Sequence, residues 1–116
     1  MGACDFRTFG QGKTAQAAFN SLVDQARWEH GHGGYTGTIA EKHSFIMIGG
    51  QPGDPKVDAK APIKVRTEEA RNAAVRLMDA RDLRIDDKWG PAGCLDCGPG
   101  DQAGERLYLF FGLASS

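Results

Sequence analysis

Near its C-terminal end the chain carries five consecutive apolar residues, Leu107 to Phe111. A β-strand directs alternate side chains to opposite faces of its sheet, so an uninterrupted apolar run leaves neither face suited to water. We therefore expect a central strand within residues 106–114. It should be covered on both faces, or covered by helices on one face and by a partner on the other.

Two segments show the apolar spacing of an amphipathic helix. The first follows Thr14, which has the side chain of an N-cap, and its apolar positions recur at the i, i+3, i+4, i+7 spacing: Ala15, Ala18, Phe19, Leu22, Val23 and Ala26. Trp28 lies off this stripe. The second helix is expected to begin at Thr67, with a buried stripe made of Ala70, Ala73, Ala74, Leu77 and Met78.

Strand-like segments occupy residues 2–9, 38–48, 88–97 and 106–114. Together with the two helices, this order predicts an α+β fold: a two-layer sandwich with two helices on one face of a mostly antiparallel sheet of four to five strands. The length predicts a single domain over residues 1–116. A connection as long as residues 49–66, rich in glycine and proline, is typical of a functional or a mobile loop.

Charge and cysteine content restrict the binding partners and the cellular compartment expected for this protein. The formal net charge is −1, which lacks the positive field of a general nucleic-acid binder. No apolar run is long enough to span a membrane, and residues 1–5 lack the features of a signal peptide. Three cysteines, an odd number, indicate reduced thiols or metal ligands rather than a disulfide framework. These features predict a cytoplasmic protein.

Residues 30–37 contain four glycines and cannot form regular structure, so they are expected to form a loop. The loop offers backbone N–H groups, two imidazoles and a phenol, and Lys42 supplies a nearby cation. This set suits a small anionic, nucleotide-like ligand. The predicted ligand-binding residues are His30, His32, Gly33, Gly34, Tyr35, Thr36, Lys42 and Trp89. The alternative is a surface loop that binds no ligand.

The same loop supplies two candidate metal ligands. His30 and His32, together with Cys94 and Cys97, would make a tetrahedral zinc set of two imidazoles and two thiolates. The two pairs come from different halves of the chain, so this hypothesis assumes that the fold brings them together. The alternative is a loop with solvated histidines and two small thiols in the core.

Three segments, residues 33–42, 86–93 and 110–116, resemble short uncharacterised proteins carried by bacteriophages and bacteria. The resemblance implies a phage or bacterial origin and an accessory role. It supplies no reaction, ligand or catalytic residue.

Three functions follow as hypotheses. The first is a non-enzymatic protein that binds a small anionic ligand through the 30–37 loop. The second is an interaction module that inhibits or assembles with a host protein, or forms a homodimer, through Trp28, Trp89 and the last strand. The third is a zinc-dependent enzyme that uses His30, His32, Cys94 and Cys97.

Overall fold

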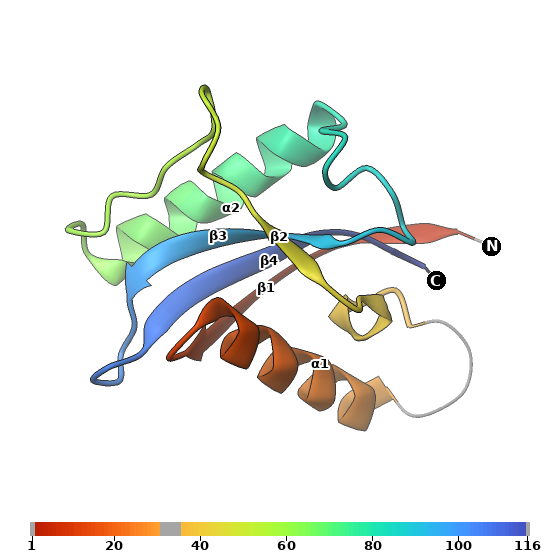
Figure 1. The fold of residues 1–116 in the computed structure, drawn as a ribbon, viewed down its shortest axis with the longest axis horizontal. Coiled ribbons are helices and arrows are strands. Elements are labelled where there is room, and N and C mark those ends of the chain that lie inside the picture. Colours follow the sequence, from red (N-terminus) through yellow and green to blue (C-terminus); the bar gives the residue numbers. More distant parts are fainter. Residues whose placement is uncertain (1, 31–35, 116) are drawn as a thin grey trace.

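The computed structural model describes residues 2–30 and 36–115 (Figure 1). Two long helices and one short 3₁₀ helix, η1, accompany four strands. In chain order the elements are β1 (Ala3–Gly12), α1 (Ala15–His30), η1 (Ile39–Glu41), β2 (Phe45–Met47), α2 (Ile63–Asp79), β3 (Ala92–Pro99) and β4 (Arg106–Ser115). Neither long helix has the length and apolarity that crossing a membrane requires.

The four strands form one open sheet in the order β1-β4-β3-β2. β4 lies between β1 and β3 and is antiparallel to both, whereas the short β2 is parallel to β3. The α+β class and the mostly antiparallel sheet are therefore confirmed. The run Leu107 to Phe111 lies in β4 and is buried throughout, as expected of a central strand covered on both faces.

The two helices lie on opposite faces of the sheet, α2 above it and α1 below it in Figure 1. The prediction that both helices cover the same face of the sheet is therefore wrong. The strand order explains why, because the β1-α1-β2 connection crosses from one edge of the sheet to the other, and β2-α2-β3 returns by one strand. Parallel crossovers are right-handed, so two crossovers that move in opposite directions place their helices on opposite faces.

Each face of β4 contributes to its own hydrophobic core. Tyr108 and Phe110 pack on the α1 side, where Phe19 of α1 lies 5.4 Å from the Phe110 ring, measured between ring centroids. Leu107, Leu109 and Phe111 pack on the α2 side instead. The predicted stripe of α1 is confirmed by the burial of Ala18, Phe19, Val23 and Ala26, and Thr14 accepts the predicted capping bond, from the Ala17 N–H at 3.1 Å.

Two predicted boundaries are wrong. α2 begins at Ile63 rather than Thr67, directly after Pro62, whose fixed φ suits the start of a helix. Thr67 does not cap the helix, because its hydroxyl donates to the carbonyl of Lys64. Residues 39–41 form η1 rather than a strand, since the Thr38 hydroxyl accepts the Ala40 N–H and starts a helical turn.

Candidate functional site

Much of the predicted ligand loop lies outside the described residues. His32, Gly33, Gly34 and Tyr35 belong to this part, and so does the side chain of His30, the last residue of α1. The prediction that these residues bind a ligand therefore stays a prediction. The structure does place the remaining members, Thr36, Lys42 and Trp89, at one end of the sheet.

Thr36 is bonded to residues of its own segment. Its backbone N–H and its hydroxyl both donate to one carboxylate oxygen of Glu41, at 3.0 and 2.8 Å. The hydroxyls of Thr36 and Thr38 lie 2.8 Å apart, and the Gly37 N–H donates to the Ser115 carbonyl of β4 at 2.8 Å. These bonds hold the chain between α1 and η1 against the end of the sheet, so Thr36 has a structural role.

Lys42 is buried inside the protein, with 1% of its surface exposed. Its ammonium donates to the carbonyls of Asp87, Lys88 and Gly90 at 3.2, 3.2 and 2.8 Å. Burial lowers the pKa of Lys42, and the nearby Asp87 carboxylate partly opposes this shift. The ammonium therefore binds the backbone of the turn that precedes β3 and is not exposed to an anion in solution.

Trp89 projects from the turn that Lys42 holds, and 61% of its surface is exposed. Its backbone N–H donates to the Asp87 carboxylate at 2.9 Å, and the Lys88 ammonium lies 5.3 Å from the centre of its ring system. Among the large apolar side chains of the described residues, Trp28 on α1 is also highly exposed, at 87%. Both indoles are therefore accessible to a partner.

The thiols of Cys94 and Cys97 do not come together. Cys94 packs in the core on the α1 side and Cys97 in the core on the α2 side, because an odd separation along a strand directs two side chains to opposite faces. Burial raises the pKa of both thiols, that of Cys97 to about 12. Opposite faces of β3 do not favour a joint metal site for this pair, and the His30 side chain and His32 lie outside the described residues, so the four-ligand zinc set stays a prediction.

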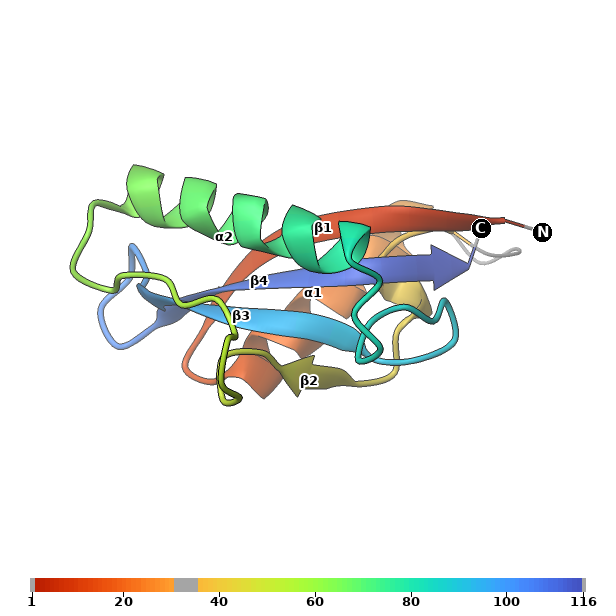
Figure 2. The ribbon, with the colours of Figure 1, turned by 90° about the horizontal axis from the view of Figure 1, so that it is seen from above.

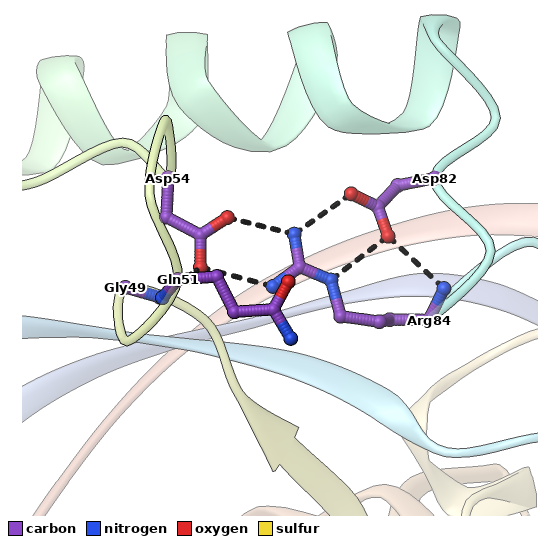
Figure 3. A network of polar contacts seen from close by, with 5 residues as sticks. All are labelled: Gly49, Gln51, Asp54, Asp82 and Arg84. Carbon is purple, nitrogen blue, oxygen red and sulfur yellow. Dashed lines mark hydrogen bonds and ion pairs between the residues drawn. The ribbon is translucent and has the colours of Figure 1, made fainter.

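Sequence patterns gave no sign of an ionic cluster that fixes the long connection after β2 (Figure 3). The guanidinium of Arg84 pairs with both carboxylate oxygens of Asp54 at 2.9 Å each, and also with the Asp82 carboxylate at 2.8 and 2.9 Å. Asp54 in turn accepts the backbone N–H groups of Gly49 and Gln51. Residues 49–54 are therefore tied to the segment after α2, which is a structural role for this part of the connection.

We expect Asp54→Asn to make the protein less stable at neutral pH. The stability of this variant should also fall less than that of the wild type as the pH is lowered. The Arg84 guanidinium holds the pKa of Asp54 and of Asp82 well below the usual range. A carboxylate with a lowered pKa in the folded state stabilises the fold above its unfolded pKa of about 4, and this contribution is lost as the pH falls toward the folded pKa. Thermal unfolding followed by circular dichroism from pH 7 to pH 2 measures the effect.

Asp24→Asn is the matched control, because Asp24 is exposed on α1, and its unfolding midpoint should follow that of the wild type throughout. A difference between wild type and Asp54→Asn that stays constant from pH 7 to pH 2 would contradict the ionic explanation.

One edge of the sheet carries a long strand paired on one side alone. β1 pairs with β4 along its whole length, from Ala3 opposite Ser115 to Gly12 opposite Arg106. Among the described residues, no hydrogen bond joins the backbone of β1 to any segment besides β4. Figure 2 shows β1 along the outer edge, with β2 at the other. Within the part of the chain that the structure describes, the outer backbone groups of β1 have no backbone partner, as in an edge strand that can pair with another polypeptide.

A shallow cleft of about 290 Å³ lies between α1 and the residues after η1. Asn20, Arg27 and His43 contribute exposed polar side chains to it, and Asp24 contributes an opposing negative charge. The cleft combines three candidate donors for an anion with one repulsive carboxylate, so its electrostatic character is mixed.

Comparison of the chain with family models, curated proteins and solved structures finds no significant match. A function for this chain is therefore inferred from its own geometry.

Proposed function

We propose that this chain is a non-catalytic protein-interaction module that binds its partner by strand addition at β1. The observation that carries the proposal is the ten-residue edge strand, which is paired with β4 on one side and with no described segment on the other. An open edge presents alternating N–H and C=O groups, and a strand from another polypeptide can satisfy them in regular order. Affinity then comes from the main chain and specificity from the side chains.

The exposed indoles of Trp28 and Trp89 support an interaction role, because tryptophan is enriched among the residues that dominate binding energy at protein interfaces. The last strand, which the sequence also suggested as an interaction surface, is unsuitable. β4 lies between two other strands and its apolar side chains are buried. The available edge belongs to the first strand instead.

Site-specific photocrosslinking from a native cysteine of β1 tests the proposal. Cys4 lies on β1 and is exposed, whereas Cys94 and Cys97 are buried thiols with raised pKa values. A benzophenone maleimide should therefore label Cys4 selectively. After irradiation in a bacterial lysate, we expect a crosslinked adduct that contains one defined polypeptide, which mass spectrometry identifies.

The matched control carries the same label on α2, in a Cys4→Ser, Lys64→Cys variant, because Lys64 is exposed and far from β1 in sequence. This control should give no defined adduct. Equal crosslinking from both positions, or none from Cys4, would overturn the proposal.

A small anionic ligand is the second candidate, supported by Arg27 and His43 at the cleft beside α1. Lys42 does not strengthen it, since its ammonium is bound to three carbonyls. Native mass spectrometry of the protein purified from a bacterial cytosol tests this candidate. A retained mononucleotide-sized mass that disappears in Arg27→Ala would support it, and a bare chain that gains no mass with added mononucleotide would count against it.

A further inference from the structure

The exposed charges on β1 indicate which polypeptide its edge fits. We propose that the partner is a second copy of this chain, and that the two β1 strands pair antiparallel with Asp5 of each copy opposite Arg7 of the other. This inference rests on the proposed role of the β1 edge in binding. It adds the identity of the partner and the register of the pairing.

Asp5 and Arg7 lie on the same face of the sheet. Phe6, between them, is buried in the core on the α1 side, whereas Phe9 packs against the core on the α2 side. Side chains alternate along a strand, so Asp5 and Arg7 share the α2 side with Phe9. Asp5 in addition lines a cleft on the α2 side, together with Met78, Ile85 and the charged residues Asp79, Arg81 and Asp86. Asp5 and Arg7 are both exposed.

A symmetric pair of antiparallel strands has a two-fold axis, and the position of that axis decides which residues face each other. An axis at Phe6 sets Asp5 opposite Arg7 of the second copy, and the symmetry repeats this contact. An axis at Asp5 would set two aspartates opposite each other, and an axis at Arg7 would do the same with two arginines. Opposite charges across strands stabilise the pair and like charges destabilise it, so the charges favour the axis at Phe6.

Pairing in this register joins two four-stranded sheets into one continuous sheet and satisfies the outer backbone groups of both β1 strands. The interface is isologous, with the same patch contributed by both copies. Charged side chains on an edge strand can also serve to prevent pairing. That alternative predicts a monomer whose state does not respond to the arrangement of these two charges.

Charge reversal distinguishes these alternatives. By sedimentation equilibrium, the wild type should form a dimer. Asp5→Arg and Arg7→Asp should each raise the dissociation constant of the dimer by at least about tenfold, because each change sets like charges opposite each other. The double variant Asp5→Arg, Arg7→Asp restores opposite charges at both contacts. The dissociation constant of its dimer should lie within about threefold of the wild-type value.

Mixing the two single variants gives a more specific test of the register. In a mixed pair, both basic side chains of one copy face both acidic side chains of the other, so a heterodimer should form although neither variant pairs well with itself. Asp24→Arg, a reversal on the exposed surface of α1, should leave the wild-type dimer unchanged. Circular dichroism confirms that each variant is folded.

A monomeric wild type, a dimer insensitive to the single reversals, or a double variant that is not restored would overturn the inference. The crosslinking experiment separates this failure from that of the proposed function. If labelled Cys4 captures a different protein and not its own chain, the β1 edge still binds by strand addition but the second copy is not its partner. If labelled Cys4 captures nothing, both proposals fall.

Discussion

Replacing Phe110 with alanine should destabilise the protein by about 4 kcal/mol, which is the usual loss for a fully buried phenylalanine in a core. Phe110 has no exposed surface and lies at the centre of an aromatic cluster. Its ring centroid is 5.4 Å from those of Phe19 and Phe45 and 6.3 Å from that of Tyr108. Because these partners come from α1, β2 and β4, the cavity would weaken contacts between three elements. Urea unfolding followed by circular dichroism measures the loss.

Phe110→Leu is the comparison variant that keeps most of the side-chain volume. It should lose less than half as much free energy of unfolding, since the isobutyl group fills part of the cavity. Trp28→Ala removes a larger aromatic ring from an exposed position and should change stability by no more than about 0.5 kcal/mol. If Phe110→Ala and Trp28→Ala cost the same, the core on the α1 side would not be packed as described.

Lys42→Met should destabilise the protein by about 2 to 4 kcal/mol, although methionine keeps most of the apolar stem. The change removes the donor for three carbonyls in the turn before β3. These bonds are part-buried, so each lost bond costs toward the lower end of the about 1 to 3 kcal/mol of an unsatisfied buried acceptor. The loss is limited because the variant also avoids the cost of burying a charge. Chemical denaturation at neutral pH measures it. We also expect faster amide exchange at Gly90, whose N–H bonds to the Asp87 carbonyl.

The pH dependence gives this prediction a second readout. The pKa of Lys42 is lowered in the folded protein, so the unfolded chain binds the proton more tightly. The contribution of Lys42 to stability is then largest above its unfolded pKa of about 10.4 and falls as the pH drops through the folded value. The difference between wild type and Lys42→Met should grow with pH in that window. Lys13→Met, at an exposed position, should show neither effect.

Several features of the fold could be predicted because they depend on the order of residues within one segment. The helical spacing from Ala15 to Ala26 and the capping hydroxyl of Thr14 define α1, and the structure confirms both. The run Leu107 to Phe111 required a central strand, and β4 is that strand. Such patterns arise from the period of a single helix or strand, which the sequence displays directly.

The candidate site was harder to predict because it depends on which segments meet. Lys42 looks like an available cation in the sequence, yet the fold buries it against carbonyls 45 to 48 residues away. Arg66 behaves similarly, since it is buried in α2 and donates to the carbonyls of Cys97 and Pro99. The pairing of Asp54 with Arg84 joins residues 30 positions apart and follows no local spacing.

By itself, the sequence determined the helical stripes, the central strand and the α+β class, since these follow from local periodicity and from the need to bury apolar side chains. The tertiary structure alone decided that the helices take opposite faces, that Cys94 and Cys97 point apart, that Lys42 is internal and that β1 lies at an open edge. Each of these depends on strand order and crossover direction, which are set by packing between distant segments and leave no periodic signal in the chain.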